Sequence, residues 1–241
     1  MKGDALYWSL RSVLNWLVWQ GELMDSENLP DEYPVVFISN HAAALGPIAV
    51  ASSLPLRVYP WVISDMMDYR KAPEYLRRDF IEPQLHLSPP HSLQVAALVT
   101  RLSVRLFHHL ECIPVWQGER LLDTYRLSLE ALVQGRSLLI FPEDPKQPMH
   151  ELYRMTPFYR GFARLGEMYY KETGRLLRYI PLAVHPDARK LKVGGSVLYN
   201  PANDPVRERN RIRNVLEAII HDLYLYLHLT LEGYAGIPLP H

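Results

Sequence analysis

The run Val35-Val36-Phe37-Ile38-Ser39 is short, apolar and rich in β-branched residues, and it stops abruptly at Asn40-His41. Small residues follow, and then Pro47, whose fixed φ suits the first turn of a helix. This order predicts a buried strand over 35–39, a loop, and a helix from about residue 47. The stretch 137–144 has the same pattern of an apolar strand followed by a polar loop. The predicted strand covers 137–141 and ends in the acidic loop Pro142-Glu143-Asp144. Because α/β proteins carry their chemistry at the carboxyl ends of parallel strands, we expect His41 and the acidic loop to converge on one site.

The rest of the chain continues this alternation of strands and helices. Strands are predicted at 58–63, 112–115, 179–184 and 191–198, and helices at 91–110, 120–134, 157–173 and 204–231, with a short helix and an irregular excursion in 65–90. Glycines stand where three helices should end, and Asp204-Pro205 is a typical helix start. The pattern predicts an α/β fold with a largely parallel central sheet flanked by helices. With no repeats or linkers, we expect an N-terminal amphipathic helix within 1–24 and one α/β domain over 25–241.

Composition narrows the class of protein. Lys plus Arg and Asp plus Glu both number 26, so the net charge is zero, which argues against a nucleic-acid partner. The single cysteine, Cys112, rules out an intrachain disulfide and any all-cysteine metal site, and it favours a reducing, cytoplasmic compartment. We expect Cys112 to be a small buried thiol in a strand rather than a nucleophile. We find neither a clear transmembrane run nor a convincing signal peptide.

The segment 5–19 is predicted to be helical. Leu6, Leu10, Val13, Leu14 and Leu17 recur at helical spacing and form one apolar face. Trp16 and Trp19 fall near the polar side, where core packing does not need them. One interpretation is a helix packed on the domain with ordinary surface aromatics. The other is an in-plane, peripheral membrane contact, because tryptophan favours the membrane–water boundary.

Several well-known sites are excluded by their motifs. The chain has no H-E-x-x-H, G-x-S-x-G, Walker A or G-x-G-x-x-G sequence. His221 and His228 are interpreted as packing or surface histidines, and Gly194-Gly195 as a turn or bulge. Arg207, Arg209, Arg211 and Arg213 form a belt around the start of the last helix, where cations oppose the helix dipole, so some compensation is expected.

An ordered set of four segments remains. They are Asn40-His41-Ala-Ala-Ala-Leu-Gly46, then Ile113-Pro114-Val115-Trp116-Gln117 with Gly118-Glu119-Arg120, then Phe141-Pro142-Glu143-Asp144-Pro145-Lys146-Gln147, and finally Ile180-Pro181-Leu182-Ala183-Val184. This order resembles the blocks of the glycerol-phosphate and lysophospholipid acyltransferase family, the 1-acylglycerol-3-phosphate acyltransferases. The likeness spans roughly residues 34–200, and the stretch from Phe158 to Ala163 resembles the family's Phe-x-x-Gly helix.

The resemblance implies a reaction and a set of residues. His41 would be the general base that deprotonates an acceptor hydroxyl, and the donor would be an acyl-CoA or acyl-carrier-protein thioester, with no metal or other cofactor. The residues implied to bind substrate are Asn40, Gln117, Arg120, Glu143 and Lys146. Three positions depart from the family pattern. Gly46 replaces the aspartate that orients the histidine, Gln117 replaces an arginine implied to grip phosphate, and Lys146 replaces a second arginine and so loses its bidentate fork.

Another carboxylate is a candidate to take the place of the aspartate that would orient His41. Asp144 stands where the family has glycine, directly after Glu143, so either carboxylate is a candidate to accept a hydrogen bond from His41. The alternative is that Asp144 caps a turn before Pro145.

Three functions follow from these observations. The first is an O-acyltransferase that acts on a lysophospholipid or another hydrophobic alcohol. The second is a catalytically silent relative that binds lipid or acyl chains, or a partner protein. The third is a changed chemistry, with an acceptor that lacks phosphate. Each agrees with a protein at the inner face of a membrane.

Overall fold

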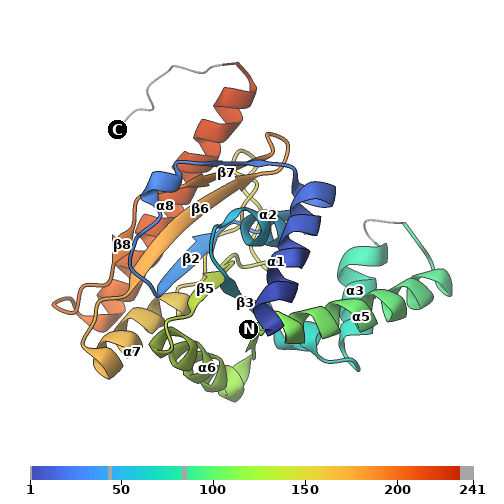
Figure 1. Cartoon of the computed structure of the whole chain (residues 1–241), viewed down its shortest axis with the longest axis horizontal. Helices are drawn as coiled ribbons and strands as arrows, with labels where there is room; N and C mark the ends of the chain where they lie inside the picture. Colours follow the sequence, from blue (N-terminus) through green and yellow to red (C-terminus); the bar gives the residue numbers. More distant parts are fainter. Residues whose placement is uncertain (1, 43–44, 83–85, 234–241) are drawn as a thin grey trace. The chain divides into compact units, whose positions relative to one another are not determined.

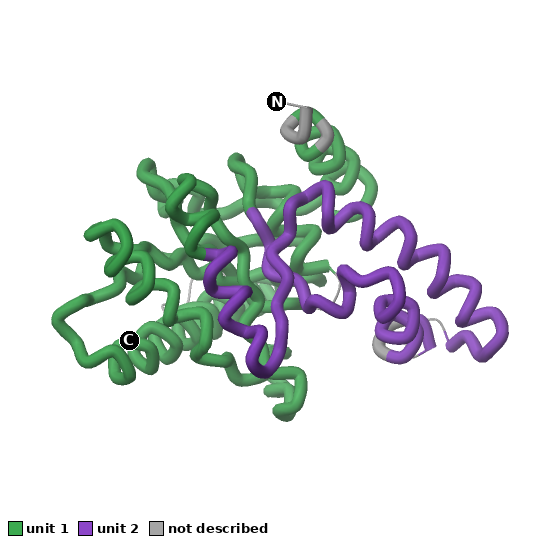
Figure 2. The backbone as a smooth tube through the Cα atoms, turned by 90° about the horizontal axis from the view of Figure 1, so that it is seen from below, with its two compact units in different colours: residues 1–58, 129–241 green, residues 59–128 purple. Residues whose placement is uncertain are grey.

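The computed structural model describes residues 2–42, 45–82 and 86–233. The chain forms two compact units, the first of residues 1–58 and 129–241 and the second of residues 59–128 (Figure 2). Residues 1–24 belong to the first unit.

The first unit is built on a mixed, mostly parallel sheet (Figure 1). Its strands are β1 (Glu22–Met24), β2 (Val35–Ser39), β5 (Ser137–Ile140), β6 (Arg178–His185), β7 (Lys190–Val193) and β8 (Val197–Leu198). The order is β1-β7-β6-β2-β5, and β8 pairs with β6. β2 runs parallel to both neighbours, β5 and β6, whereas β7 and β8 are antiparallel to β6. The predicted α/β fold with a largely parallel sheet is therefore confirmed.

Helices cover both faces of this sheet, as expected for buried parallel strands. Alternate residues of a strand point to opposite faces. Val35 and Phe37 of β2 join Ile180, Leu182 and Val184 of β6 in one core with α2 (Leu45–Ser53). The intervening residues of β6 face the other side, where α8 (Pro205–Leu231) packs. The first unit also contains α7 (Arg164–Thr173), preceded by a 3-10 turn over Gly161–Ala163, and a short 3-10 turn at Ser26–Asn28.

The second unit is the segment of the chain between the two halves of the first. It contains the parallel pair of β3 (Val58–Ile63) and β4 (Ile113–Val115). Short helical segments follow β3 at Ser64–Met67, Ala72–Leu76 (α3) and Arg77–Ile81, and then comes the long helix α5 (His91–His109). A 3-10 turn at Gly118–Arg120 leads into α6 (Leu121–Val133), which continues into the first unit. Cys112 is buried, as expected for a structural thiol.

Helix ends follow local chemistry. Asp204 accepts hydrogen bonds from the backbone N–H groups of Val206 and Arg207, both at 3.0 Å, which confirms the predicted N-cap of α8. α7 ends at Gly174, whose φ of +71° is the left-handed conformation that glycine adopts without strain.

Two predicted elements need correction. The helix predicted over 157–173 begins only at Arg164, because the backbone of Phe158 and Tyr159 bonds to other segments instead of starting a helix. The single strand predicted over 191–198 is split into β7 and β8. From Val193 to Val197 the chain advances four residues while its partner β6 advances only three, from Leu182 to Tyr179. The extra residue at Gly194-Gly195-Ser196 is a bulge, which agrees with the expectation for the glycine pair.

The N-terminal helix also differs from its predicted orientation. α1 (Lys2–Leu14) is followed by a π-helical turn, Asn15–Trp19, so the segment 5–19 is helical. Trp19 is fully buried in the core with α2, so the prediction that core packing does not need it was wrong. Val13 and Leu17 of the predicted apolar face are exposed instead, and the side chain of Leu6 lies outside the described set. Arg11 donates hydrogen bonds to the carbonyl oxygens of Ser52 and Ser53 at the end of α2.

Candidate functional site

The candidate site lies where β2 and β5 end side by side in the first unit. Val36, Phe37 and Ile38 of β2 pair in parallel with Leu138, Leu139 and Ile140 of β5. Since parallel neighbours end at the same edge of a sheet, the loop that begins at Asn40-His41 and the loop that begins at Phe141 leave the sheet together (Figure 1).

Glu143 joins these two loops. Its Oε1 accepts a hydrogen bond from the backbone N–H of His41, and its Oε2 accepts one from the backbone N–H of Thr156 at 3.0 Å. The exposed His41 ring lies against Phe141, with the ring centroids 5.2 Å apart. The loops therefore converge as the sequence predicts. The Glu143 carboxylate contacts the backbone amide of His41.

Asn40 holds the start of the histidine loop from below. Its side chain is 1% exposed, its Nδ2 donates to the Val184 carbonyl oxygen at 2.9 Å, and its Oδ1 accepts from the Val184 N–H at 2.8 Å. This two-point pairing to β6 uses both the donor and the acceptor ends of the amide. The contacts give Asn40 a positioning role, and substrate binding by this residue remains a prediction from the resemblance.

Asp144 is held within its own turn. Its Oδ1 accepts hydrogen bonds from the Lys146 backbone N–H at 2.9 Å and from the Tyr159 hydroxyl at 2.6 Å. The hydrogen bond from Tyr159, followed by the one from Lys146, lowers the pKa of Asp144 from its ordinary value. The alternative interpretation, a carboxylate that caps a turn before Pro145, is therefore confirmed. None of these contacts gives Asp144 the orienting role that was hypothesised for it.

Gly46 sits directly against the backbone of His41. A Cβ atom placed on Gly46 would lie 2.1 Å from the His41 carbonyl oxygen and 3.1 Å from that of Asn40. Real Cβ atoms do not approach backbone oxygen this closely, so the loop as folded has no room for any side chain at position 46. Gly46, where the resemblance implies an aspartate, thus allows the close contact between the first turn of α2 and the backbone of His41.

Of the remaining predicted site residues, one belongs to the first unit and two belong to the second. Lys146 lies in the same loop as Asp144 and its side chain is exposed. Its backbone N–H bonds to Asp144, so this part of Lys146 belongs to the site. Gln117 and Arg120 belong to the second unit, where the Arg120 guanidinium lies over the Trp116 ring at 4.5 Å and pairs with Asp123 at 3.7 Å. The structure brings together Asn40, His41, Glu143, Asp144 and Lys146.

The loop between Phe141 and Gly161 is closed at its base by backbone hydrogen bonds that the sequence did not reveal. Tyr159 N–H donates to the Pro142 oxygen at 2.7 Å, and Asp144 N–H donates to the Pro157 oxygen at 2.9 Å. The N–H of Phe158 donates to Oε1 of Glu217 on α8 at 2.9 Å. Thr156, Tyr159 and Glu217 therefore support the site. The one sequence signal that could have indicated this is Pro157, since a proline disfavours helix at the residue before it.

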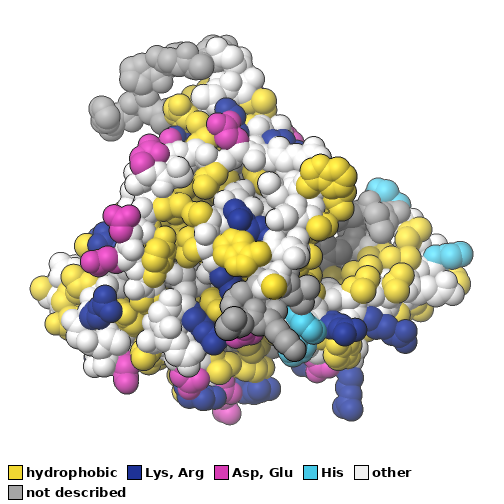
Figure 3. Space-filling view, viewed as in Figure 1, with side chains coloured by type: hydrophobic (Ala, Val, Ile, Leu, Met, Phe, Trp, Pro, Cys, Tyr) yellow, Lys and Arg dark blue, Asp and Glu magenta, His cyan; other side chains and the backbone are white. Residues whose placement is uncertain are grey.

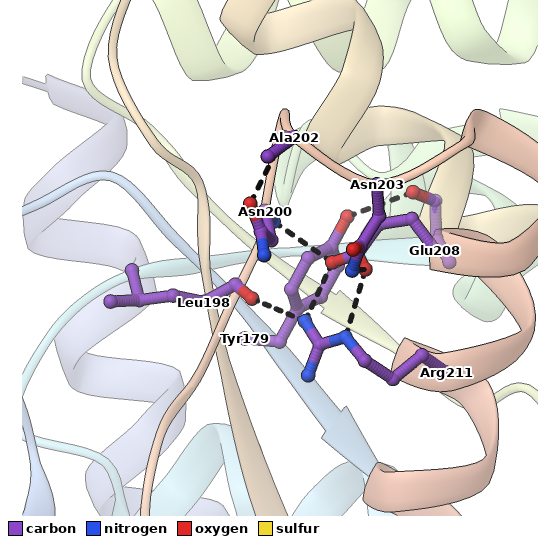
Figure 4. Close-up of polar contacts among 8 residues, drawn as sticks. Tyr179, Leu198, Asn200, Ala202, Asn203, Glu208 and Arg211 are labelled. Atoms are coloured by element: carbon purple, nitrogen blue, oxygen red, sulfur yellow. Dashed lines mark hydrogen bonds and ion pairs between the residues drawn. The ribbon is translucent and has the colours of Figure 1, made fainter.

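A second polar cluster, at the start of α8, has a structural explanation (Figure 4). Burial by itself would raise the pKa of Glu208, but hydrogen bonds from Arg211, Asn203 and the Asn200 backbone outweigh it and lower the pKa to about 2. The Glu208 side chain is fully buried, and Arg211 also donates to the Leu198 carbonyl oxygen at 2.7 Å. The carboxylate thus ties β8 and the following loop to α8. Beside it an open cleft of about 610 Å³, lined in part by Val197, Arg211, Val215 and Ile219, lies apart from the His41 loop.

Contacts within the fold also account for three arginines and two histidines of α8. Arg209, Arg211 and Arg213 pair with Glu167, Glu208 and Glu217, which supplies the compensation expected for the arginine belt. His221 stacks on Tyr153 with centroids 4.2 Å apart, and His228 lies against the buried His185. Within the described ranges, no group of three or more His, Cys, Asp or Glu residues could hold a metal ion.

Comparisons with known proteins support the fold. No family model and no curated protein sequence matches this chain. Among solved structures, it is similar to the 1-acyl-sn-glycerophosphate (LPA) acyltransferase PlsC from Thermotoga maritima, with a TM-score of 0.55 and 13% identity over 97% of this chain and 80% of that one. At this identity the likeness concerns the fold. Of the helices in the described part of the chain, none has the length and hydropathy needed to cross a bilayer.

Proposed function

We propose that this protein is a divergent O-acyltransferase that transfers a fatty acyl group from a thioester donor to a lysophospholipid or another hydrophobic alcohol. The donor would be acyl-CoA or an acylated carrier protein, and His41 would be the general base. The observation that carries the proposal is the exposed imidazole at the end of the central strand, beside the Phe-Pro-Glu loop, on a fold similar to that of an LPA acyltransferase.

The proposed reaction needs one base and a site for the acceptor. His41 takes the proton of the acceptor hydroxyl as its oxygen attacks the thioester carbonyl carbon. A carbon–oxygen bond forms, the carbon–sulfur bond breaks, and the proton passes to the departing thiolate. Lys146, in the adjacent loop, would contact an acidic or polar headgroup, and Phe141 would shield one side of the imidazole from water.

Glu143 would act as a positioning residue in this reaction. By accepting a hydrogen bond from the His41 backbone N–H, Glu143 holds the loop that carries the imidazole. This hydrogen bond does not involve the imidazole ring itself. This arrangement differs from the orienting carboxylate that the resemblance implies, because the contact is to the main chain.

A second candidate function is favoured by Gly46. The space for the orienting aspartate is filled by the His41 backbone, which suits a relative that has lost catalysis and binds lipid or acyl chains, or a partner protein. In a serine protease, loss of the equivalent orienting carboxylate lowers kcat by about 10⁴. The two candidates share a ligand class and differ in turnover.

The proposal extends to a place at the inner face of a membrane, with the N-terminal helix as a peripheral contact. Its support is the exposed apolar group of Val13, Trp16, Leu17 and Val18, at the end of α1 and in the π-helical turn that follows it. Tryptophan and leucine on one surface favour an interfacial position.

Turnover decides between the candidates. Labelled acyl-CoA is incubated with a panel of lysophospholipids and long-chain alcohols, using the wild type, His41→Ala and the control His91→Ala, which removes an exposed histidine in the second unit. An acyltransferase forms labelled ester that falls by a factor of about 10²–10⁴ in His41→Ala and is unchanged in His91→Ala. Equal background in all three proteins contradicts an enzyme that uses His41 and leaves the silent relative.

A further inference from the structure

Helix α5 in the second unit is amphipathic in the wrong sense for a helix that packs on a protein in water. Its buried residues, Ser92, Ala96, Thr100 and Val104, are four apart and mostly small or polar. Three larger apolar residues are exposed instead: Leu98 is 62% exposed, Leu102 68% and Val99 37%. A surface helix normally does the reverse and turns its leucines to the core.

The exposed side of α5 is also basic. No acidic residue occurs from His91 to His109. Arg105 continues the row that Leu98 and Leu102 begin, and Arg101 borders it. Within the described part of the chain, neither Arg101 nor Arg105 forms an ion pair, whereas the arginines of α8 pair with glutamates. In Figure 3 apolar side chains gather over α5, at the lower right, with Lys or Arg side chains beside them.

We propose that this face of α5, the Leu98–Arg105 face, docks on the surface of an anionic lipid bilayer. The helix would lie in the plane of the membrane, with Leu98, Val99 and Leu102 among the upper acyl carbons and the two guanidinium groups on lipid phosphates. A basic, apolar helix face binds in this way, and each arginine near an anionic leaflet contributes about 1 kcal/mol. Its 19 residues give a contact about 28 Å long.

Charge and polarity together favour a bilayer over other occupants. A nucleic acid would satisfy the arginines but would leave the leucines in water. A second copy of the helix, packed face to face, would bring unpaired arginines together across the interface. An anionic membrane meets both requirements, because its phosphates lie directly above its apolar layer. Unlike the proposed function, this docking requires no acyl transfer, so its test does not depend on turnover.

The experiment measures partitioning of the full chain onto vesicles of phosphatidylcholine, with and without 30% phosphatidylglycerol. It compares wild type, the double variant Leu98→Gln/Leu102→Gln, the double variant Arg101→Gln/Arg105→Gln, and the control Leu122→Gln. Leu122 is 63% exposed at the start of α6 in the same unit, so the control removes an equally exposed leucine away from α5. Circular dichroism and sedimentation of each protein report folding and oligomeric state.

We expect the leucine variant to bind anionic vesicles at least tenfold more weakly than wild type, with Leu122→Gln unchanged. The arginine variant should lose about 30-fold on anionic vesicles and little on phosphatidylcholine alone, since two arginines at about 1 kcal/mol each are removed. Three outcomes overturn the proposal. They are no vesicle binding by wild type, equal binding by the leucine variant, and a wild-type dimer that the leucine variant dissociates while its vesicle binding is unchanged.

Discussion

The Glu143 carboxylate accepts the backbone N–H of His41 with one oxygen, while its other oxygen accepts the N–H of Thr156. A single side chain thereby joins the loop after β2 to the far end of the loop after β5. Both donors are backbone amides, so a donor group in place of either carboxylate oxygen would lose that hydrogen bond.

This geometry predicts the effect of Glu143→Gln. The amide keeps one acceptor oxygen and turns its NH₂ toward a second N–H, so one charge-assisted hydrogen bond is replaced by two donors that face each other. We expect a loss of about 1.5–3 kcal/mol in the free energy of unfolding, measured by urea denaturation. In an active enzyme kcat should fall with it, while His41→Ala should lower kcat with little change in stability.

A control for Glu143→Gln is available in the same loop. Lys146→Gln alters an exposed side chain whose backbone N–H, not its amine, bonds to Asp144. Its stability should stay within about 0.5 kcal/mol of wild type. Equal stability of Glu143→Gln and wild type would show that the hydrogen bonds of Glu143 to the two backbone amides do not stabilise the fold.

Gly46 yields a second prediction. Introducing the aspartate that the resemblance implies, Gly46→Asp, would place a Cβ 2.1 Å from the His41 carbonyl oxygen, so the loop or α2 must shift. We expect it to cost at least about 2 kcal/mol of stability and to give no gain in acyl transfer. Gly46→Ala introduces the same Cβ without the carboxylate and should cost nearly as much. A gain in turnover by Gly46→Asp alone would mean that the loop reforms around a restored Asp–His pair.

Much of the fold could be predicted from local patterns. The strand over 58–63 and the N-cap of the last helix were predicted as observed, because a β-branched run and an Asp-Pro start are local signals. β1 was missed, since Glu22–Met24 is a short edge strand recognisable only through its pairing with β7. Trp19 was misplaced because helical periodicity does not reveal that its helix ends in a π-turn that swings the indole inward.

The site was predictable in part for the same reason. His41 and Glu143 stand at strand ends, which the sequence marks, and parallel pairing brings them together. Which atoms meet depends on the backbone course of two loops. The hydrogen bond of Glu143 to the His41 amide and the role of Gly46 could therefore be recognised only in the structure. Gln117 and Arg120 follow the last strand of the second unit, and no local pattern places them relative to His41.

The N-terminal helix gives a third prediction. Deleting residues 1–20 would remove Tyr7 and the fully buried Trp19, and so would open the core. Trp16→Gln/Leu17→Gln instead changes side chains that are 73% and 61% exposed. We expect this variant to keep its stability and to bind vesicles at least tenfold more weakly if the end of α1 contacts the membrane. Trp19→Ala, the matched core change, should cost about 3–5 kcal/mol. Unchanged vesicle binding by the double variant would show that these two side chains do not contact the membrane.

Glu208 gives a fourth prediction, on the pH dependence of stability. Its pKa is about 2 in the folded protein, against an ordinary value of 4.5, so folding favours the ionised form. The contribution to stability is therefore complete above pH 4.5 and is lost as the pH falls toward 2, amounting to about 3 kcal/mol for this difference in pKa. Urea denaturation at pH 7, 4 and 3 should show the decline. Glu208→Gln should be less stable than wild type at pH 7, since it leaves the Arg211 guanidinium without its buried partner, and the gap should narrow at pH 3. A gap that stays constant across this range would show that the Glu208 carboxylate is not what stabilises the start of α8.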